Sequence, residues 1–145
     1  TMEIGDVFRE MKEKLCYVSL DYDLELQKAK STKECEVVFP YEKTGVEITL
    51  NDERLRCPEI LFKPYMNGFE YDGIQNMIYD SIKKCQKEIQ NELYSNIFLS
   101  GSNTLFKGLP ERIEKEIKLL APEGSNVKIP RDDNNADSYC FLMFI

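Results

Sequence analysis

The stretch NIFLSGSNTLFKGLPERI, residues 96–113, joins an apolar segment to a helical pattern through small, flexible residues. Three apolar residues, 97–99, predict a short buried strand that ends at Ser100. A segment of small residues between a strand and a helix lets a ligand approach the backbone, and in α/β proteins that ligand is often a nucleotide. The flanking sequence must support that interpretation, since a single glycine-containing loop is a weak signal and a simple connection is about as probable.

The second half of the chain predicts a parallel α/β unit. Apolar residues from Ile74 to Leu93 recur at helical spacing and predict one long helix. Pro110 suits the first turn of another helix, which Pro122 ends. Residues 127–129 predict a further strand. The order of helix, strand, loop, helix and strand is typical of a parallel sheet.

The first half predicts α+β structure. Residues 6–18 form an amphipathic pattern with Asp6 as the N-cap, and residues 21–30 predict a second short helix. The segments 35–40 and 46–50 are rich in β-branched residues and predict a hairpin. Prolines restrict residues 51–64 to short helical turns, and residues 65–73 predict a loop.

Composition excludes several functions. The net charge of −7 over 145 residues argues against a nucleic-acid partner. The absence of histidine excludes Ser-His-Asp and Cys-His catalysis and every histidine-ligated metal site. The five cysteines form no C-x-x-C pair and favour free thiols in a reducing cytosol. The apolar run 139–145 is too short to cross a bilayer, and a chain that stops inside such a run is expected to be part of a longer protein.

Two groups of polar residues are candidates for a site. Arg9, Lys12 and Glu13 lie at helical spacing, where an exposed helix face with one ion pair is the more common explanation. The segment DDNNADS, residues 132–138, resembles the start of a calcium loop. It lacks the required glycine and the bidentate glutamate, so we interpret it as a polar loop.

Three separated segments resemble actins and actin-related proteins. They are MKEKLCYVSLDYD at 11–23, NDERLRCPEILFKP at 51–64 and LYSNIFLSGSNTLFKGLPERIEKEIKLLAP at 93–122. Their order, their spacing and their uncommon residue combinations match the actin pattern over nearly the whole chain. The resemblance implies the α/β fold of the actin, Hsp70 and sugar-kinase ATPases, and of that fold the nucleotide-side lobe only. Residues 1–69 resemble most of the small upper subdomain (subdomain 4), and residues 70–145 resemble the later part of the larger subdomain (subdomain 3).

The resemblance also implies which residues contact ATP. Those that correspond to the adenosine-binding positions are Arg9, Lys12, Glu13, Gly101, Ser102, Leu105 and Phe106. Ser102 stands where actins have a second glycine, and no basic residue matches the one expected near the adenine, where Asp137 lies. The phosphate loops, the metal-associated aspartates for Mg²⁺ and the water-positioning glutamine have no match here. We therefore expect weak ATP binding and no ATPase activity from this chain alone.

Two function classes follow from the resemblance. The first is a cytoplasmic, cytoskeletal actin that binds ATP and forms filaments with other actin-like subunits or actin-binding proteins. The second is a non-polymerising actin-related subunit of a chromatin remodeller, which would be nuclear, or of a filament nucleator. The positions that match subunit contacts are Met66, Phe69, Pro122 and Glu123. Unpaired edges of the strands at 97–100 and 127–129 lead us to expect that the chain self-associates.

Overall fold

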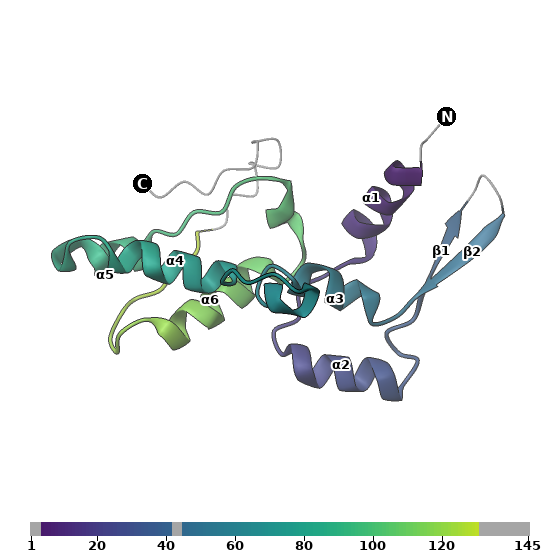
Figure 1. The fold of residues 1–145 in the computed structure, drawn as a ribbon, viewed down its shortest axis with the longest axis horizontal. Coiled ribbons are helices and arrows are strands. Elements are labelled where there is room, and N and C mark those ends of the chain that lie inside the picture. Colours follow the sequence, from purple (N-terminus) through teal and green to yellow (C-terminus); the bar gives the residue numbers. More distant parts are fainter. Residues whose placement is uncertain (1–3, 42–44, 131–145) are drawn as a thin grey trace.

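The computed structural model describes residues 4–41 and 45–130, and the segments at 132–138 and 139–145 lie outside this range. Its elements run in the order helix, helix, hairpin and then a series of helices (Figure 1). They are α1 (Ile4–Leu15), α2 (Tyr22–Ser31), β1 (Val37–Tyr41), β2 (Val46–Leu50), α3 (Glu53–Glu59), η1 (Pro64–Asn67), α4 (Ile74–Lys83), α5 (Lys87–Ser95), η2 (Ser102–Leu105) and α6 (Leu109–Leu120).

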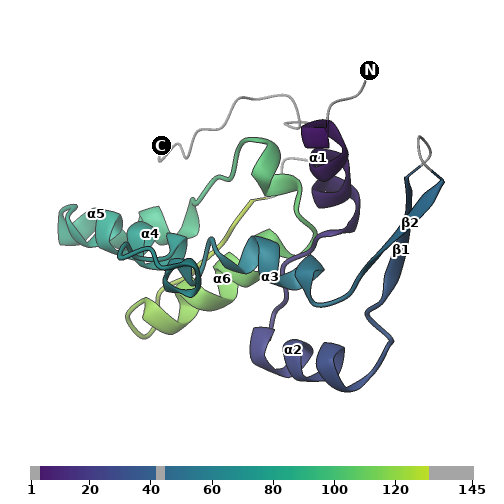
Figure 2. The same ribbon diagram turned by 45° about the vertical axis from the view of Figure 1, so that its right-hand side comes forward.

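The elements separate into two groups along the long axis of the molecule (Figure 1). Helices α4, α5 and α6 gather at one end, with α4 packed on α6. Helix α2 and the hairpin lie at the other end, and α3 lies between the two groups. Figure 2 shows that α1 stands beside the loop that carries η2. The boundary proposed between residues 69 and 70 stays a prediction.

The predicted hairpin is confirmed. Strands β1 and β2 pair antiparallel, with Val37 opposite Leu50 and Tyr41 opposite Val46. Side chains along β1 alternate between half-buried and exposed, as expected of a ribbon with one face toward the protein. Two further bonds hold its base, since Arg54 Nη1 donates to Cys35 O (2.8 Å) and Asn51 Nδ2 donates to Ala29 O (2.8 Å).

The first predicted helix is displaced, and the second is confirmed. Helix α1 ends at Leu15 rather than at residue 18, and Asp6 lies in its first turn. It ends there because Val18 leaves the helix face, and its N–H donates to Lys107 O (2.8 Å) on a distant segment. Helix α2 covers nearly the predicted range, and the structure adds that Asp21 is its N-cap, accepting from the Leu24 N–H (3.4 Å).

The prediction of one long helix over residues 74–93 is wrong, because the chain breaks between α4 and α5. The side chain of Gln90 donates to Lys83 O (3.3 Å) and to Cys85 O (2.8 Å). These carbonyls would otherwise accept from the backbone four residues later, so the side-chain amide substitutes for the continued helix. The apolar periodicity does not report this competition.

The strands predicted at 97–100 and 127–129 are not strands in the described chain. The two segments do lie together, since Ile97 N–H donates to Lys128 O (3.4 Å) and Lys128 N–H donates to Tyr94 O (3.1 Å). Two bonds do not make a ladder, so the segments lie together without regular strand pairing. The edge-pairing argument for self-association therefore loses its basis, and self-association stays a prediction.

One apolar core joins α4, α6 and the segments between them. Its central side chains, Ile113 and Ile117 of α6 and Ile78 and Ile82 of α4, are almost fully buried. The other buried members are Val18, Phe62, Tyr94, Ile97, Phe106, Leu109, Val127 and Ile129. A smaller cluster of Tyr22, Ala29 and Leu55 lies beneath α2. Val18 and Phe106 carry the larger core toward α1.

A buried arginine connects three distant segments. Arg112, 4% exposed, donates to Ser19 O (2.6 Å) and through Nε to Glu116 Oε1 (2.6 Å). Its two terminal nitrogens also bond the two carboxylate oxygens of Glu59, each at 3.1 Å. Burial raises the pKa of Glu59, against the opposing effect of Arg112 and Lys63. These acceptors offset the cost of burying the charged guanidinium.

Replacing Arg112 by Met should destabilise the protein by about 3–5 kcal/mol, because the buried Glu59 carboxylate would lose both guanidinium bonds and keep only Lys63, at 3.7 Å. Chemical denaturation monitored by circular dichroism measures this change. Lys118→Met is the control, since Lys118 pairs with Glu114 on the exposed face of the same helix and should cost about 1 kcal/mol at most. Adding Glu59→Met to Arg112→Met should recover part of the loss. Equal stabilities for the Arg112 and Lys118 variants would contradict this account.

Gly108 allows the segment before α6 to approach Val18. Its φ of +87° is left-handed, and a Cβ at this position would lie 2.3 Å from Val18 O. Gly124, after α6, has nearly the same φ (+86°) but nothing within 4 Å of its Cβ position. A side chain at either glycine would therefore have the same left-handed backbone strain, but only at Gly108 would it also collide with the Val18 carbonyl.

Gly124→Ala should lower the free energy of unfolding by about 1–2 kcal/mol, because alanine is strained in the left-handed backbone conformation. Gly108→Ala should cost roughly 1–3 kcal/mol more, because the Val18 carbonyl must move. Thermal or urea unfolding of the two variants measures the difference. Equal destabilisation by the two substitutions would show that the close approach at Gly108 has no energetic weight.

Candidate adenosine site

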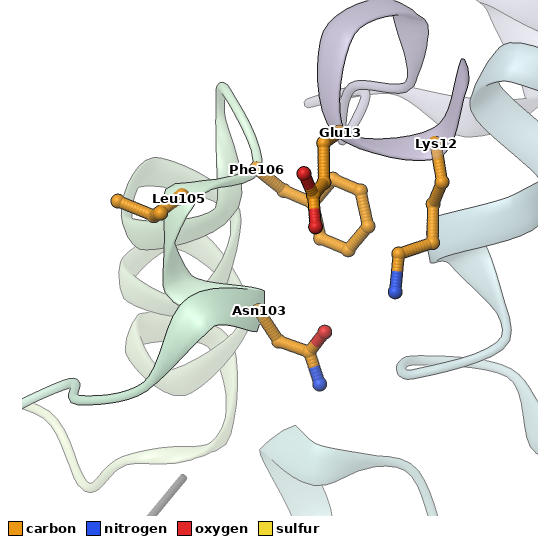
Figure 3. A pocket seen from close by; sticks show the side chains of 5 residues that line it. All are labelled: Lys12, Glu13, Asn103, Leu105 and Phe106. Atoms are coloured by element: carbon orange, nitrogen blue, oxygen red, sulfur yellow. The ribbon is translucent and has the colours of Figure 1, made fainter. Parts of the chain in front are cut away.

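A small cavity lies between the last turn of α1 and the loop that carries η2. Its volume is about 120 Å³, and it is lined by Lys12, Glu13, Asn103, Leu105 and Phe106. Figure 3 shows Lys12 and Glu13 descending from α1 on one side and Asn103 entering from the loop on the other. The cavity thus brings together two segments far apart in the sequence.

The ring of Phe106 forms the apolar wall of the cavity. Phe106 is 9% exposed because it belongs to the core, and the Lys12 ammonium lies 5.7 Å from its ring centroid. This distance is within the range of a cation–π contact. In Figure 3 the side chains of Lys12, Glu13 and Asn103 extend toward the same space beside the ring. The result is one flat apolar surface bordered by three polar groups.

Local backbone structure brings the loop to this position. Gly101 is buried and has a φ of +100°, a conformation that favours glycine. Its carbonyl accepts from both the Thr104 N–H (2.9 Å) and the Thr104 hydroxyl (2.6 Å), which closes the single turn η2. The loop then rejoins the protein where Val18 N–H bonds Lys107 O (2.8 Å). Phe106 is therefore fixed on both sides.

The structure brings four of the seven predicted adenosine-contacting residues around the cavity, namely Lys12, Glu13, Leu105 and Phe106. Leu105 forms part of the rim, is 62% exposed, and points away from Lys12 in Figure 3. Arg9 and Gly101 are not among the described residues that line it. Arg9 lies 3.7 Å from Asp6 on the exposed face of α1, Gly101 precedes η2, and Ser102 begins that turn.

Asn103 lines the cavity and was not identified from the sequence. It lies in the segment of small residues after Ser100, where the sequence indicates a candidate ligand loop without distinguishing its members. An amide offers both a donor and an acceptor, so a polar residue of this kind inside a suspected ligand loop is the signal that could have identified it.

A larger open groove lies beside the cavity and shares Glu13 and Leu105 with it. Its volume is about 730 Å³. Tyr17 in its wall has a pKa raised to about 12, chiefly by burial and then by the Glu25 carboxylate. The groove's other lining residues are Lys14, Leu15, Cys16, Val18, Leu20, Glu34, Cys35, Arg54, Lys107, Gly108 and Glu111. Its charges are mixed in sign, so it does not select for an anion or a cation.

The predicted subunit contacts lie on the surface. Around η1, Tyr65, Met66, Phe69 and Tyr71 are 68%, 39%, 44% and 61% exposed. The rings of Phe69 and Tyr71 stack at 5.1 Å between centroids. Pro122 and Glu123, after α6, are also exposed. Several large apolar side chains thus gather on one short loop, and this distinguishes them from exposed residues scattered singly.

Within residues 4–41 and 45–130, no helix is long and apolar enough to span a bilayer. The same part of the chain contains no group of three or more Cys, Asp or Glu side chains arranged to hold a metal ion.

Comparison with known protein families agrees with this architecture. The family model described as Actin matches residues 1–140. This match includes both segments that form the cavity and all the described helices and strands. The mixed helices and small sheet are consistent with the α/β fold of actin-like ATPases, and the chain belongs to the actin family.

Proposed function

We propose that the cavity between α1 and η2 binds the adenosine part of an adenine nucleotide. The observation that carries the proposal is the convergence of Lys12, Glu13, Asn103 and Phe106 on one cavity of about 120 Å³. At ~30 Å³ for each water this is room for roughly four waters, which suits one flat ring system.

Each polar group around the cavity suits a different part of adenosine. The Asn103 amide has the donor and acceptor that match the polar edge of adenine. The Glu13 carboxylate is an acceptor suited to ribose hydroxyls, a role that acidic residues have in other nucleotide sites. The Phe106 ring gives the base an apolar surface, and Lys12 borders it.

The phosphates gain little from this cavity. Among the described residues that line it Lys12 is the only cation, and the Glu13 carboxylate beside it opposes a triphosphate. In the full-length protein, the phosphate loops and Mg²⁺ would be supplied by segments that this chain lacks. ATP and adenosine should therefore bind this chain with similar, weak affinity.

Ligand-observed NMR titration of the chain with adenosine and with ATP tests this site. We expect a Kd of about 1 mM for both, which corresponds to about −4 kcal/mol. Lys12→Ala and Asn103→Ala should each weaken adenosine binding about fivefold to tenfold through lost polar contacts. Lys28→Ala on α2 removes the same charge away from the cavity and is the control. Unchanged binding in both cavity variants, or micromolar affinity for ATP, would contradict the assignment.

For the full-length protein we propose a cytoskeletal actin-like subunit that assembles into filaments with ATP. The support is the exposed apolar loop around η1, since Met66 and Phe69 correspond to positions that contact a neighbouring subunit in actins. The second candidate is a non-polymerising actin-related subunit of a larger complex. The departure that favours it is the polar Asn67 between these two apolar residues.

Sedimentation of the full-length protein with ATP and Mg²⁺ distinguishes these two functions. A filament-forming protein should pellet, and Phe69→Asp should reduce the pelleted fraction by about tenfold or more, because a charge would enter an apolar contact. Leu119→Asp is the matched control, since Leu119 is 73% exposed on α6. Failure of the unaltered protein to pellet would favour the non-polymerising subunit.

A further inference from the structure

Two cysteines from distant segments meet where α1 ends against α3. Cys16 directly follows Leu15, the last residue of α1, and Cys57 lies within α3. Arg54, one helical turn before Cys57, holds both neighbours of Cys16. It donates from Nε to Leu15 O (2.9 Å), and its carbonyl accepts from the Tyr17 N–H (3.2 Å). These two bonds hold the residues on either side of Cys16 against the helical turn that leads to Cys57.

The two thiols interact with each other and differ in accessibility. Cys57 is exposed and Cys16 is half-buried. The hydrogen bond from Cys16 lowers the pKa of Cys57 to about 6, burial opposes that change, and the Lys12 ammonium supports it. The same hydrogen bond and burial raise the pKa of Cys16. The interaction between the thiols therefore favours the thiolate on the accessible sulfur and the protonated form on the sheltered one.

We propose that Cys16 and Cys57 form a hydroperoxide-sensitive dithiol site, with Cys57 as the attacking sulfur and Cys16 as the resolving one. A thiolate that is exposed, adjacent to a cation and beside a second thiol has the features of redox-sensitive cysteines. Neither the family match nor the adenosine site assigns a role to these sulfurs. The proposal does not depend on nucleotide binding.

The reaction has two steps. The Cys57 thiolate attacks one oxygen of hydrogen peroxide, the O–O bond breaks, and Cys57 becomes a sulfenic acid while hydroxide leaves and takes a proton. The Cys16 sulfur then attacks the Cys57 sulfur, the S–O bond breaks, and water leaves with the Cys16 proton. One disulfide and two waters result, so the two thiols lose two electrons and the peroxide gains them.

The pair also lies against the residue that borders the cavity. The Cys16 N–H donates to Lys12 O (3.2 Å), so the disulfide would form at the last turn of α1. Oxidation removes the thiolate that faces the Lys12 ammonium. The site thus connects the redox state of the chain with the charge balance beside Lys12.

The test is oxidation of the 145-residue chain by a small excess of hydrogen peroxide, followed by alkylation and peptide mass spectrometry. We expect an intramolecular Cys16–Cys57 disulfide as the first product. Cys16→Ser should stop the reaction at a Cys57 sulfenic acid, trapped by a dimedone probe. Cys57→Ser should abolish the fast thiol loss. Cys85→Ser is the control, since Cys85 is also exposed but its thiol donates to Ser81 O (3.5 Å).

The pH profile of the first step is the sharper readout. Relative to an ordinary cysteine of pKa ~8.5, a pKa of about 6 raises the thiolate fraction at pH 7 by roughly 30-fold, and lower nucleophilicity offsets about tenfold of this. The rate at pH 7 should therefore rise only about threefold, but its midpoint should lie near pH 6. The reaction accelerates as pH rises through this value, because the thiolate is the attacking form.

Three results would overturn the proposal. They are a first disulfide that includes any other cysteine, no trapped sulfenic acid in Cys16→Ser, and a pH midpoint at the ordinary thiol value. Far-UV circular dichroism checks that each variant folds. If Cys57→Ser does not fold, trapping in Cys16→Ser still decides the identity of the attacking sulfur.

Discussion

The buried guanidinium of Arg112 is the constraint on which the arrangement of the chain depends. An arginine at 4% exposure is tolerated only when nearly every donor has an acceptor, and here the acceptors come from Ser19, Glu59 and Glu116. Ser19 follows α1, Glu59 ends α3, and Glu116 lies on α6 with the arginine itself. No single element can satisfy the charge, so the three must assemble around it, and the apolar core of α4 and α6 forms against the same helix.

The candidate site takes its geometry from this junction. Once Ser19 O is bonded to Arg112, the preceding residue Val18 lies where its N–H reaches Lys107 O, and Gly108 leaves room for the carbonyl of Val18. Lys107 directly follows Phe106, so the aromatic wall of the cavity is positioned through the backbone. Lys12 arrives from the other side on α1. The cavity residues themselves make few mutual bonds, and their relative position is set by contacts outside the cavity.

Local signals in the sequence predict the elements that depend on local interactions. The second short helix, the β-branched hairpin strands and Pro110 at the start of α6 each depend on interactions within a few residues, and the structure confirms them. The prediction of one long helix was wrong because the Gln90 side chain donates to carbonyls that would otherwise accept from the helix backbone. Apolar periodicity does not detect this competition. Resemblance identified Lys12 and Phe106 of the cavity. The sequence did not predict the cavity position of Asn103, the Arg112 network or the Cys16–Cys57 pair, because each depends on contacts between segments far apart in the chain.

The hairpin has a dynamic consequence that follows from its isolation. In the described chain β1 and β2 form a two-stranded sheet, and Val38 and Val46 on it are 49% and 55% exposed. A two-stranded ribbon has little stability of its own in water, so its order depends on the Arg54 and Asn51 bonds at its base. Such a ribbon opens without global unfolding. Its inter-strand amides should exchange with solvent well before those of α6, and the hairpin can change its direction while the Arg112 junction stays intact.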